Sequence, residues 1–293
     1  MSGSKVSLLD QLTKDLISVG ISTARIDATA LLAHVTQSSK ANVIAGNFEL
    51  STKQHTLLGK LVARRKTQEP LAYVLGQKEF YGRSFFVTKH TLIPRPESEA
   101  VISLALQLNL PLGSNVIDIG TGCGALGITY RLEIPKQRPG DKPDRATNVE
   151  PTGSRAWLHL NDISDQAIAV AKQNARSHKV CAQCLEQDFT KLKSLEHYDL
   201  VLANLPYVPA DKQRKFESDT PGLIYEPELA LYAAEDGLSL YRQLLGKKYK
   251  AGCYVIIEAL IEQHDSLLDL AKSHSFELHS SDNLALCLKK LAS

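Results

Sequence analysis

The chain has 293 residues, of which 43% are hydrophobic and 23% are charged, with a formal net charge of +2 at pH 7. This balance is typical of a globular protein with a sizeable core, and the small net charge predicts no strong affinity for nucleic acid by itself. No apolar run approaches the roughly 18 residues of a transmembrane helix, and the first residues lack the apolar centre of a signal peptide.

The first 70 residues are predicted to be helical, because apolar side chains recur there with helical spacing. We expect the three stripes to be core, and we expect the basic cluster Arg64–Lys66 at the end of the third stripe to be a solvated helix end. Small helical modules usually recognise a partner, an expectation that rests on analogy. The stripes are Leu8, Leu9, Leu12 and Leu16; then Ile26, Ala30, Leu31 and Val35; then Leu57, Leu58, Leu61 and Val62.

The pattern changes at residues 77–88, which are predicted to form two short aromatic strands that turn at Gly82-Arg83. After this hairpin, Pro94 and Pro96 stiffen an extended stretch, and Pro96 can open a helix that runs to about Leu108. We therefore expect a helical domain at residues 1–75, a hairpin linker at 76–93 and an α/β domain at 94–293.

From Asn115 onward, strands and helices alternate, which predicts a doubly wound, mostly parallel sheet of seven strands. A helix is expected at 164–178, capped by Ser164. The last two strands should form an antiparallel hairpin on the sheet edge, joined by residues 280–283. The segment 135–154 has four prolines and two glycines, so we expect a mobile surface insertion there. The predicted strands are 116–119, 157–161, 184–186, 200–203, 254–258, 276–279 and 284–288.

A glycine-rich loop, Asp118-Ile-Gly-Thr-Gly-Cys-Gly124, follows the first of these strands. Alternating glycines let a backbone approach a ligand closely, and dinucleotide, mononucleotide and sulfonium cofactors all use such loops. This one lacks the Gly-x-Gly-x-x-Gly spacing preferred for a pyrophosphate and the Lys-Ser/Thr pair of a P-loop. Asp118 disfavours a phosphate and suits a cation, such as the amino-acid end of S-adenosyl-L-methionine (AdoMet).

Two later strands also end in acidic residues. Asp162 can take both hydroxyls of a ribose, and it can equally cap the following helix. It lies 42 residues after Gly120, against a usual distance of about 20, and the 135–154 insertion accounts for nearly all of the excess. Asp188 can accept from an adenine amine while Phe189 stacks on the base. The same pair could also be a plain strand end with a core phenylalanine.

The five cysteines include a lone CxxC pair, Cys181 and Cys184, with His178 three residues earlier. A structural zinc site needs four ligands, and no second pair lies nearby, so we expect no metal. Without a signal peptide, five cysteines favour reduced thiols and a cytoplasmic location.

The turn Asn204-Leu205-Pro206-Tyr207 follows an apolar strand, and ligands of open α/β sheets bind at the carboxyl ends of strands. The Asn204 side chain and the Leu205 carbonyl can accept hydrogen bonds from an NH2 group, and Pro206 stiffens the turn. Tyr207 offers a flat face for stacking. The turn therefore suits a planar nitrogen, either a carboxamide or an exocyclic amine, although it could simply end the strand.

As a set, these motifs resemble those of the PrmC/HemK-type protein glutamine methyltransferases, which methylate the glutamine of the Gly-Gly-Gln motif in peptide-chain release factors. The resemblance runs nearly end to end. It is carried by Pro70–Gly76, Glu79–Gly82, Leu92–Glu97, the glycine loop, Asp162–Ser164, Asn204–Tyr207, Tyr225–Pro227 and Glu235–Leu238. The family's turn is usually Asn-Pro-Pro-Tyr, so Leu205 is a departure that keeps the carbonyl and loses one ring.

The resemblance implies a class I AdoMet-dependent methyltransferase fold that acts on release factors, with the helical domain as the substrate-recognition module. We expect a monomer with no membrane and no direct nucleic-acid partner. Together with the arguments above, the resemblance implies that the glutamine amide is held by Asn204, Leu205, Pro206 and Tyr207. AdoMet would be held by Asp118, Gly120, Thr121, Gly122, Cys123, Gly124, Asp162, Asp188, Phe189 and Asn204.

Three alternatives stay open at this point. Asn-Leu-Pro-Tyr is also similar to the turn of ribosomal-RNA adenine dimethyltransferases, so the substrate could be an adenine of RNA or DNA. Relatives that methylate a ribosomal-protein glutamine are similar too, but they typically carry Pro-Arg-Ser-Pro in place of Pro94–Glu97. A protein that binds AdoMet without catalysis is the third possibility.

Overall fold

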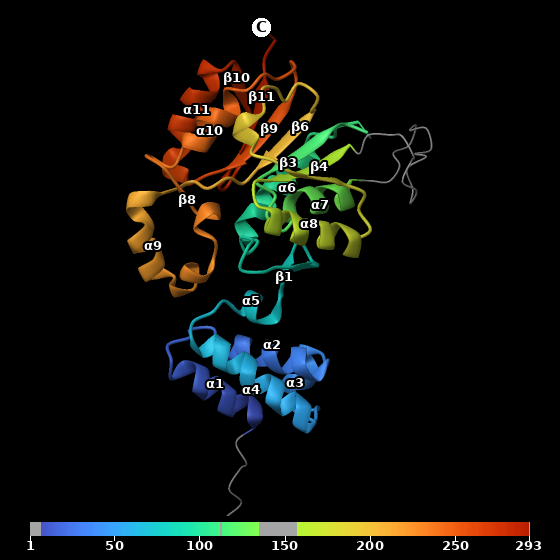
Figure 1. The fold of residues 1–293 in the computed structure, drawn as a ribbon, viewed down its shortest axis with the longest axis vertical. Helices are drawn as coiled ribbons and strands as arrows, with labels where there is room; N and C mark the ends of the chain where they lie inside the picture. The colour runs from blue at the N-terminus through green and yellow to red at the C-terminus, as the bar shows by residue number, and fades with distance from the viewer. Residues whose placement is uncertain (1–6, 112, 135–156, 293) are drawn as a thin grey trace, which may run out of the picture. The chain divides into compact units, whose positions relative to one another are not determined.

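The computed structural model describes residues 7–111, 113–134 and 157–292, and the chain divides into two compact units (Figure 1). The helical unit contains Met1–Gln77 and the short segment Thr220–Tyr225, and the α/β unit contains the remainder. The insertion predicted at 135–154 lies outside the described residues. Among the described helices, none has both the length and the apolar character that crossing a bilayer requires.

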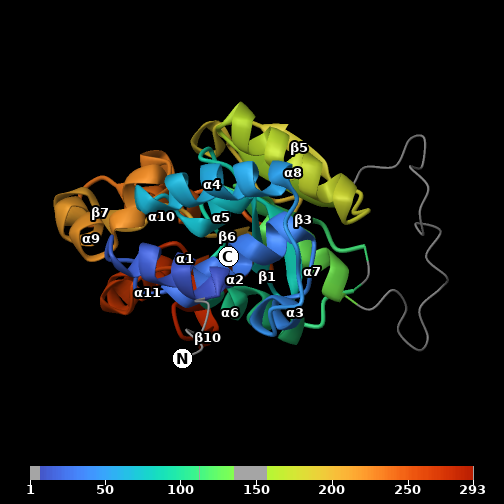
Figure 2. The same cartoon turned by 90° about the horizontal axis from the view of Figure 1, so that it is seen from below.

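The helical unit begins with α1 (Leu8–Ile17), which packs along α2 (Ala24–Thr36), and α2 packs along α4 (Thr52–Lys66) (Figure 2). The shorter helices α3 (Lys40–Ile44) and α5 (Leu71–Leu75) complete it, together with the 3-10 helix η4 (Pro221–Tyr225). Serine side chains cap three of these helices, including α3, where Ser39 accepts from the Asn42 backbone. Ser7 caps α1, and Ser51 forms a capping box with Gln54 at α4, which satisfies backbone N–H groups of the first turn.

Two residues predicted for the core of this unit are on its surface. Ile26 is 67% exposed and Leu57 is 42% exposed. The buried face of α2 runs instead through Ala28, Leu31 and Val35. These positions follow the i, i+3, i+7 spacing of one helix face, and Ile26 lies about half a turn away from it. The prediction is therefore confirmed for Leu31 and Val35 and wrong for Ile26.

The basic cluster Arg64–Lys66 was predicted to be a solvated helix end. The side chains of Arg64 and Lys66 are 45% and 37% exposed, as predicted, whereas Arg65 is an exception. Arg65 lies 2.6 Å from the Asp27 carboxylate, and both side chains are nearly buried. Arg64 pairs with Glu69 and also donates to the carbonyl oxygen of Tyr73 at 3.0 Å. The cluster therefore ties the end of α4 to α2 and α5.

The α/β unit opens with a hairpin of β1 (Gln77–Phe80) and β2 (Arg83–Phe86). Its two turn residues are Tyr81 and Gly82, with φ of 50° and 69°, one position earlier than predicted. Positive φ at both positions gives a turn whose twist matches that of the flanking strands. After the hairpin, Pro96–Ser98 form a 3-10 turn (η1), and α6 begins at Glu99 instead of Pro96.

The remaining elements alternate in type along the chain. The longer helices are α6 (Glu99–Gln107), α7 (Ala125–Glu133), α8 (Asp165–Ser177), α9 (Gln213–Asp219), α10 (Ser239–Leu245) and α11 (His264–Ser273). The strands are β3 (Val116–Ile119), β4 (Leu158–Asp162), β5 (Gln183–Glu186), β6 (Leu200–Ala203), β7 (Val208–Pro209), β8 (Tyr232–Ala233), β9 (Tyr254–Glu258), β10 (Phe276–Asp282) and β11 (Ala285–Lys290). Short 3-10 helices lie at Phe189–Lys191 (η2), Ala210–Lys212 (η3), Glu228–Ala230 (η5) and Ile261–Gln263 (η6).

The main sheet has seven strands in the order β10-β11-β9-β6-β3-β4-β5, which confirms the predicted doubly wound α/β fold. Strands β3, β4, β5, β6 and β9 are parallel, and β10 and β11 add an antiparallel hairpin at one edge. Helices α6, α7 and α8 cover one face, and α10 and α11 cover the other (Figure 1). From β3 the chain adds β4 and β5 on one side and then returns to add β6 on the other side of β3. Folds of this kind bind ligands at the point between β3 and β6 where the strand order reverses.

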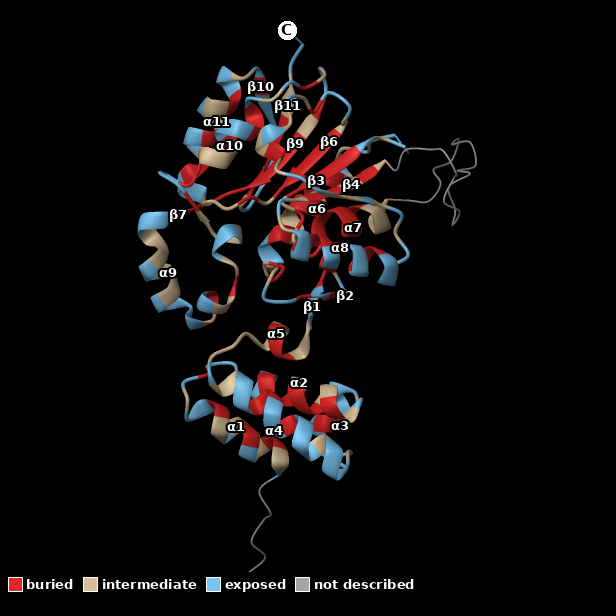
Figure 3. Ribbon diagram, viewed as in Figure 1, coloured by how far each residue is buried: buried red, intermediate tan, exposed pale blue. Residues whose placement is uncertain are grey.

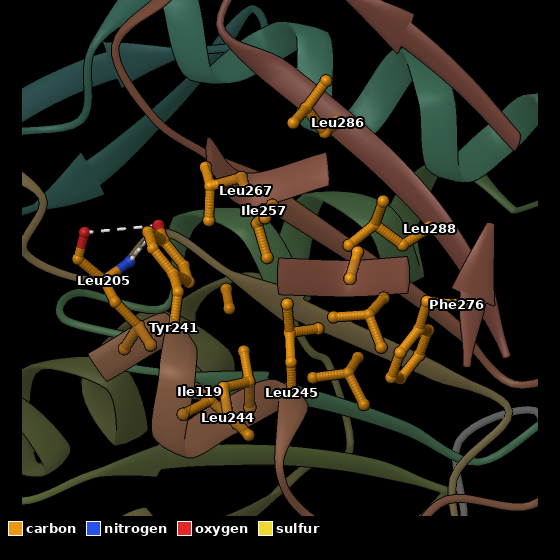
Figure 4. Packing of buried hydrophobic residues seen from close by; sticks show 14 of the residues in the cluster. Ile119, Leu205, Tyr241, Leu244, Leu245, Ile257, Leu267, Phe276, Leu286 and Leu288 are labelled. Carbon is orange, nitrogen blue, oxygen red and sulfur yellow. Dashed lines mark hydrogen bonds between the residues drawn. The ribbon is translucent and has the colours of Figure 1, made fainter. Parts of the chain in front are cut away.

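Because helices cover both faces of the sheet, its central strands form the core. Strands β3 and β6 are buried along their whole length (Figure 3), as expected for parallel strands with helices on both faces. Figure 4 shows Tyr241 of α10 at one side of a large apolar cluster, beside Leu205. The candidate ligand turn is therefore anchored directly to the core.

Candidate functional site

A cavity of about 390 Å³ lies at the carboxyl ends of β3, β4, β5 and β6. Four of the segments that line it continue these strands: Gly120–Leu126 without Gly124, Asn161–Ser164, Gln187–Thr190 and Asn204–Pro206. The sheet thus brings together residues that are up to 86 positions apart in the sequence. The volume of the cavity, and its mostly apolar wall with a few polar groups, are typical of a small-molecule site.

The glycine loop needs its glycines for steric reasons. Gly120, Gly122 and Gly124 all have positive φ, between 55° and 86°, where other residues are strained. A Cβ on Gly120 would also lie 2.9 Å from the Leu205 side chain, and one on Gly124 would lie 2.7 Å from Ile128. Gly120, Thr121, Gly122 and Cys123 line the cavity, whereas Gly124 does not.

Asp118 does not line the cavity, although the sequence placed it at the ligand. It is fully buried beneath the loop, where one oxygen accepts from the Thr121 hydroxyl at 2.6 Å and from the Gly127 backbone at 2.9 Å. Its other oxygen, Oδ1, is buried and meets no donor among the described residues. Burial raises the pKa of Asp118 to about 6. This acid therefore fixes the loop and the first turn of α7.

Asp162 lines the cavity and also holds the loop. Its Oδ2 accepts from the Gly122 backbone at 2.9 Å, and its Oδ1 accepts from the Ser164 backbone at 3.0 Å. Burial raises the pKa of Asp162. The cap of α8 is Ser164, whose hydroxyl accepts from Ala167. Each oxygen of Asp162 keeps a further lone pair for a ligand hydroxyl.

Asp188 and Phe189 lie on the next wall of the cavity. One Asp188 oxygen accepts from the backbone and the hydroxyl of Thr190, at 2.9 and 2.7 Å, and this hydroxyl lowers the pKa of Asp188. Between these two acidic strand ends lies Asn161, a residue that the sequence did not single out. It is 1% exposed, it faces the cavity, and its amide donates to the carbonyl oxygens of Leu185 and Gln187.

The turn after β6 places Asn204, Leu205 and Pro206 at the cavity. The Asn204 amide nitrogen donates to the Ser98 hydroxyl at 3.0 Å. The amide oxygen, Oδ1, is therefore the end of the Asn204 side chain that does not bond to Ser98. The Leu205 backbone N–H donates to the Tyr241 hydroxyl at 3.3 Å, and the Leu205 carbonyl oxygen lies 3.4 Å from the same hydroxyl (Figure 4).

Tyr207 does not line the cavity, so the predicted stacking face is turned elsewhere. Its hydroxyl donates to Glu258 Oε1 at 3.0 Å, and its carbonyl oxygen accepts from the Gln263 side chain at 2.9 Å. Gly237 lies so close that a Cβ there would be 2.1 Å from the same carbonyl oxygen. The Glu235-Asp-Gly-Leu238 motif is thus explained as a support behind the turn.

A second pair of motifs meets at one wall of the cavity. Glu226, 5% exposed, accepts from the Ile93 backbone at 3.0 Å and from the Arg95 guanidinium at 2.6 Å. Arg95 lines the cavity, as do Pro227, Leu229 and Ala230, which follow Glu226. This ion pair holds the Pro94–Glu97 stretch against the segment after Tyr225.

Asn174, on the buried face of α8, joins the hairpin to the glycine loop. Its amide nitrogen donates to the Cys123 carbonyl oxygen at 2.8 Å and to the Phe86 carbonyl oxygen at 2.9 Å. Its oxygen accepts from the Phe86 backbone at 2.8 Å. Sequence reasoning missed Asn174, because its partners are 51 and 88 positions away. His178, next to the CxxC pair, contacts the Ser84 carbonyl of the same hairpin.

The chain is similar to known methyltransferases. Residues 7–76 match a family model described as the PrmC N-terminal domain. A release factor glutamine methyltransferase of Enterococcus faecalis is 32% identical over 225 residues, which cover 76% of this chain and 74% of that protein. One of Coxiella burnetii is 30% identical over 263 residues, covering 87% and 85%.

Longer relatives match as well. A protein of Rickettsia bellii named a bifunctional methyltransferase is 28% identical over 291 residues, covering 88% of this chain. The matched region is only 49% of that relative. The chain therefore spans about half the length of these bifunctional proteins.

Proposed function

The chain belongs to the release factor glutamine methyltransferase family, and on that basis we propose that it methylates the glutamine side chain of the Gly-Gly-Gln motif in peptide-chain release factors, with AdoMet as the methyl donor. The observation that carries the proposal is the Asn204 turn. It places one amide acceptor at the cavity, next to the glycine loop that follows the neighbouring strand.

The cavity residues fit AdoMet. Gly120 and Gly122 carry no Cβ and adopt positive φ without strain, so ligand atoms can approach the backbone there. Asp162 can accept from the ribose hydroxyls, Asp188 can accept from the adenine amine, and Phe189 can contact the base. When bound, AdoMet supplies an activated methyl group on a sulfonium, so the protein needs no strong base.

The role of the turn is to orient a poor nucleophile. An amide nitrogen is weakly nucleophilic because its lone pair is delocalised. Asn204 Oδ1 and the Leu205 carbonyl oxygen can accept the two N–H bonds of a glutamine, which fixes the nitrogen and stabilises the charge that develops on it. The Tyr241 hydroxyl has only one hydrogen, which it donates to the Glu258 carbonyl, so the Leu205 carbonyl keeps its capacity to accept. The proton leaves after transfer, to water.

The helical unit, in this proposal, grips a second surface of the release factor. Its basic cluster is held in pairs with Asp27, Glu69 and Asp15. These pairs reduce the charge available for a phosphate backbone, which argues against RNA or DNA as the substrate. We further propose that the enzyme acts as a cytoplasmic monomer. All five of its thiols are free, in keeping with a reducing compartment.

The test offers the enzyme three acceptors with labelled AdoMet: a whole release factor, a short Gly-Gly-Gln peptide and structured ribosomal RNA. We expect label on the glutamine of the factor, located by mass spectrometry, and much slower labelling of the peptide, because remote contacts contribute to the rate. Label in the RNA and none on the glutamine would establish the adenine alternative. Label on a ribosomal-protein glutamine in a cell extract would establish the second alternative, a glutamine methyltransferase that acts on a ribosomal protein.

The matched variant for this assay is Asn204→Ala. We expect it to keep its melting temperature and AdoMet affinity and to lose methyl transfer by orders of magnitude, since the lost contact acts mainly in the transition state. Gln173→Ala removes an exposed amide on α8 and should change none of these quantities. An Asn204→Ala enzyme with nearly normal turnover would remove the turn from the mechanism.

A further inference from the structure

Glu258 is a buried acid for which the mechanism above has no role. It ends β9 and is only 1% exposed. Its Oε1 accepts from Tyr207 at 3.0 Å, whereas its Oε2 is buried without an aligned donor among the described residues. A buried carboxylate is costly unless donors surround it. Such a group next to a substrate turn therefore requires an explanation.

The second observation concerns the polarity of the Asn204 amide. Its nitrogen and oxygen can exchange places by a rotation of 180°, and a serine hydroxyl can serve either end, because it both donates and accepts. Contact with Ser98 at 3.0 Å therefore does not by itself decide which end of Asn204 faces the cavity. Something must decide where the single hydrogen of Ser98 goes.

Glu258 can make that decision. Ser98 is 4% exposed, and the side chains of Ser98, Tyr207 and Asn204 all lie close enough to Glu258 to lower its pKa against the larger, opposite effect of burial. An ionised carboxylate only accepts. If the Ser98 hydrogen goes to Oε2, the Ser98 oxygen can only accept from Asn204, and the Asn204 oxygen must face the cavity.

We propose that Glu258, acting through Ser98, fixes the Asn204 amide with its oxygen toward the substrate, so that Glu258 and Ser98 are positioning residues for methyl transfer. This inference rests on the function proposed above. The polarity runs from the Asn204 N–H to Ser98 and from the Ser98 O–H to Glu258, and it gives Oε2 the donor that it otherwise lacks.

The charge of Glu258 is essential to this arrangement. A protonated Glu258 can donate to Ser98, which frees the Ser98 hydrogen for Asn204 and reverses the chain. Other titratable groups near it are Tyr207, Tyr241 and Glu97. Both tyrosines have raised pKa values, with burial as the largest cause, so they stay neutral over the working range. Glu97 raises the pKa of Glu258 further. Turnover should therefore fall as the pH is lowered toward the pKa of Glu258.

The experiment compares Glu258→Gln, Ser98→Ala and Ser98→Thr with the wild type. The first two should lower kcat by about 10- to 100-fold, as loss of a supporting hydrogen bond commonly does, with AdoMet affinity within about threefold and the melting temperature nearly kept. Ser98→Thr keeps the hydroxyl and should restore turnover. In Glu258→Gln, the acidic fall in kcat should disappear. Ser103→Ala, a matched change on α6 away from the cavity, should have no effect.

A second measurement does not depend on activity. The side-chain NH2 signals of Asn204, assigned by their loss in Asn204→Asp, should exchange slowly with solvent in the wild type and Ser98→Thr, and at least tenfold faster in Ser98→Ala and Glu258→Gln. A wild type that methylates no glutamine, with these exchange rates as expected, would refute the proposed function and leave the orientation intact. Unchanged kcat, pH profile and exchange in both variants would overturn the proposal, even where the proposed function holds.

Discussion

Asn174→Ala is a direct test of how the hairpin and the glycine loop are held together. The substitution removes three hydrogen bonds at once, two to Phe86 and one to Cys123. The Cys123 carbonyl oxygen is buried, and a stranded buried acceptor costs about 1–3 kcal/mol. The two bonds to Phe86 are partly buried and add about 0.5–1 kcal/mol each. The free energy of unfolding should therefore fall by roughly 2–5 kcal/mol.

The assay follows the fluorescence of Trp157 during heating. It is the single tryptophan of the chain, and it lies in the α/β unit, stacked against Arg131. A loss of this size should lower the melting temperature by roughly 4–20 °C, at about 2–4 °C per kcal/mol. Gln173→Ala, an exposed neighbour on the same helix, should leave it unchanged.

Asn174→Asp tests the orientation of the amide. It keeps the acceptor but replaces both donated bonds by a carboxylate that faces two carbonyl oxygens, so at neutral pH it should cost more than the alanine. If Asn174→Ala melts within about 1 °C of the wild type, or if Asn174→Asp is the milder change, the assigned hydrogen bonds are wrong.

Two further predictions concern the acids around the loop. Asp162→Ala removes the acceptor of Gly122 and should weaken AdoMet binding by about 1–3 kcal/mol in calorimetry, whereas the exposed Asp165→Ala should not; equal affinities would exclude a role for Asp162. Asp118 has a pKa raised from 3.8 to about 6, so its contribution to stability is fully present below pH 3.8 and is lost as the pH rises through about 6. The free energy of unfolding of the wild type minus that of Asp118→Asn should fall by on the order of 3 kcal/mol between about pH 4 and pH 7, and a flat difference in denaturant titrations would contradict the raised pKa.

The sequence was most informative where burial is two-sided. Parallel strands covered by helices are continuous apolar runs, and the predicted limits of 116–119, 200–203 and 254–258 agree with β3, β6 and β9. The edge strands are less regular. The last hairpin turns at Asn283 and Leu284, so β10 extends through the segment 280–282 that was predicted as its loop.

The sequence was least informative about partners that are distant along the chain. From sequence alone Arg65 resembles a surface residue, but in the fold it pairs with Asp27. Tyr207 resembles a stacking ring, but its hydroxyl donates a hydrogen bond to Glu258. Local patterns identify residue types and faces, whereas a hydrogen-bond partner depends on the finished sheet. The glycine loop and the Asn204 turn could be found because strand ends can be read from sequence.

The helical unit includes Thr220–Tyr225, with the Tyr225 hydroxyl donating to the Thr67 carbonyl oxygen at 2.6 Å and Gly222 close to the ring of Pro70. During synthesis, these six residues appear more than 140 positions after Gln77. At about 5–20 residues per second, that is a delay of roughly 7–30 s. Over that time the end of α4 and the start of α5 remain uncovered on the nascent chain. The N-terminal module is therefore completed only after most of the α/β sheet has left the ribosome.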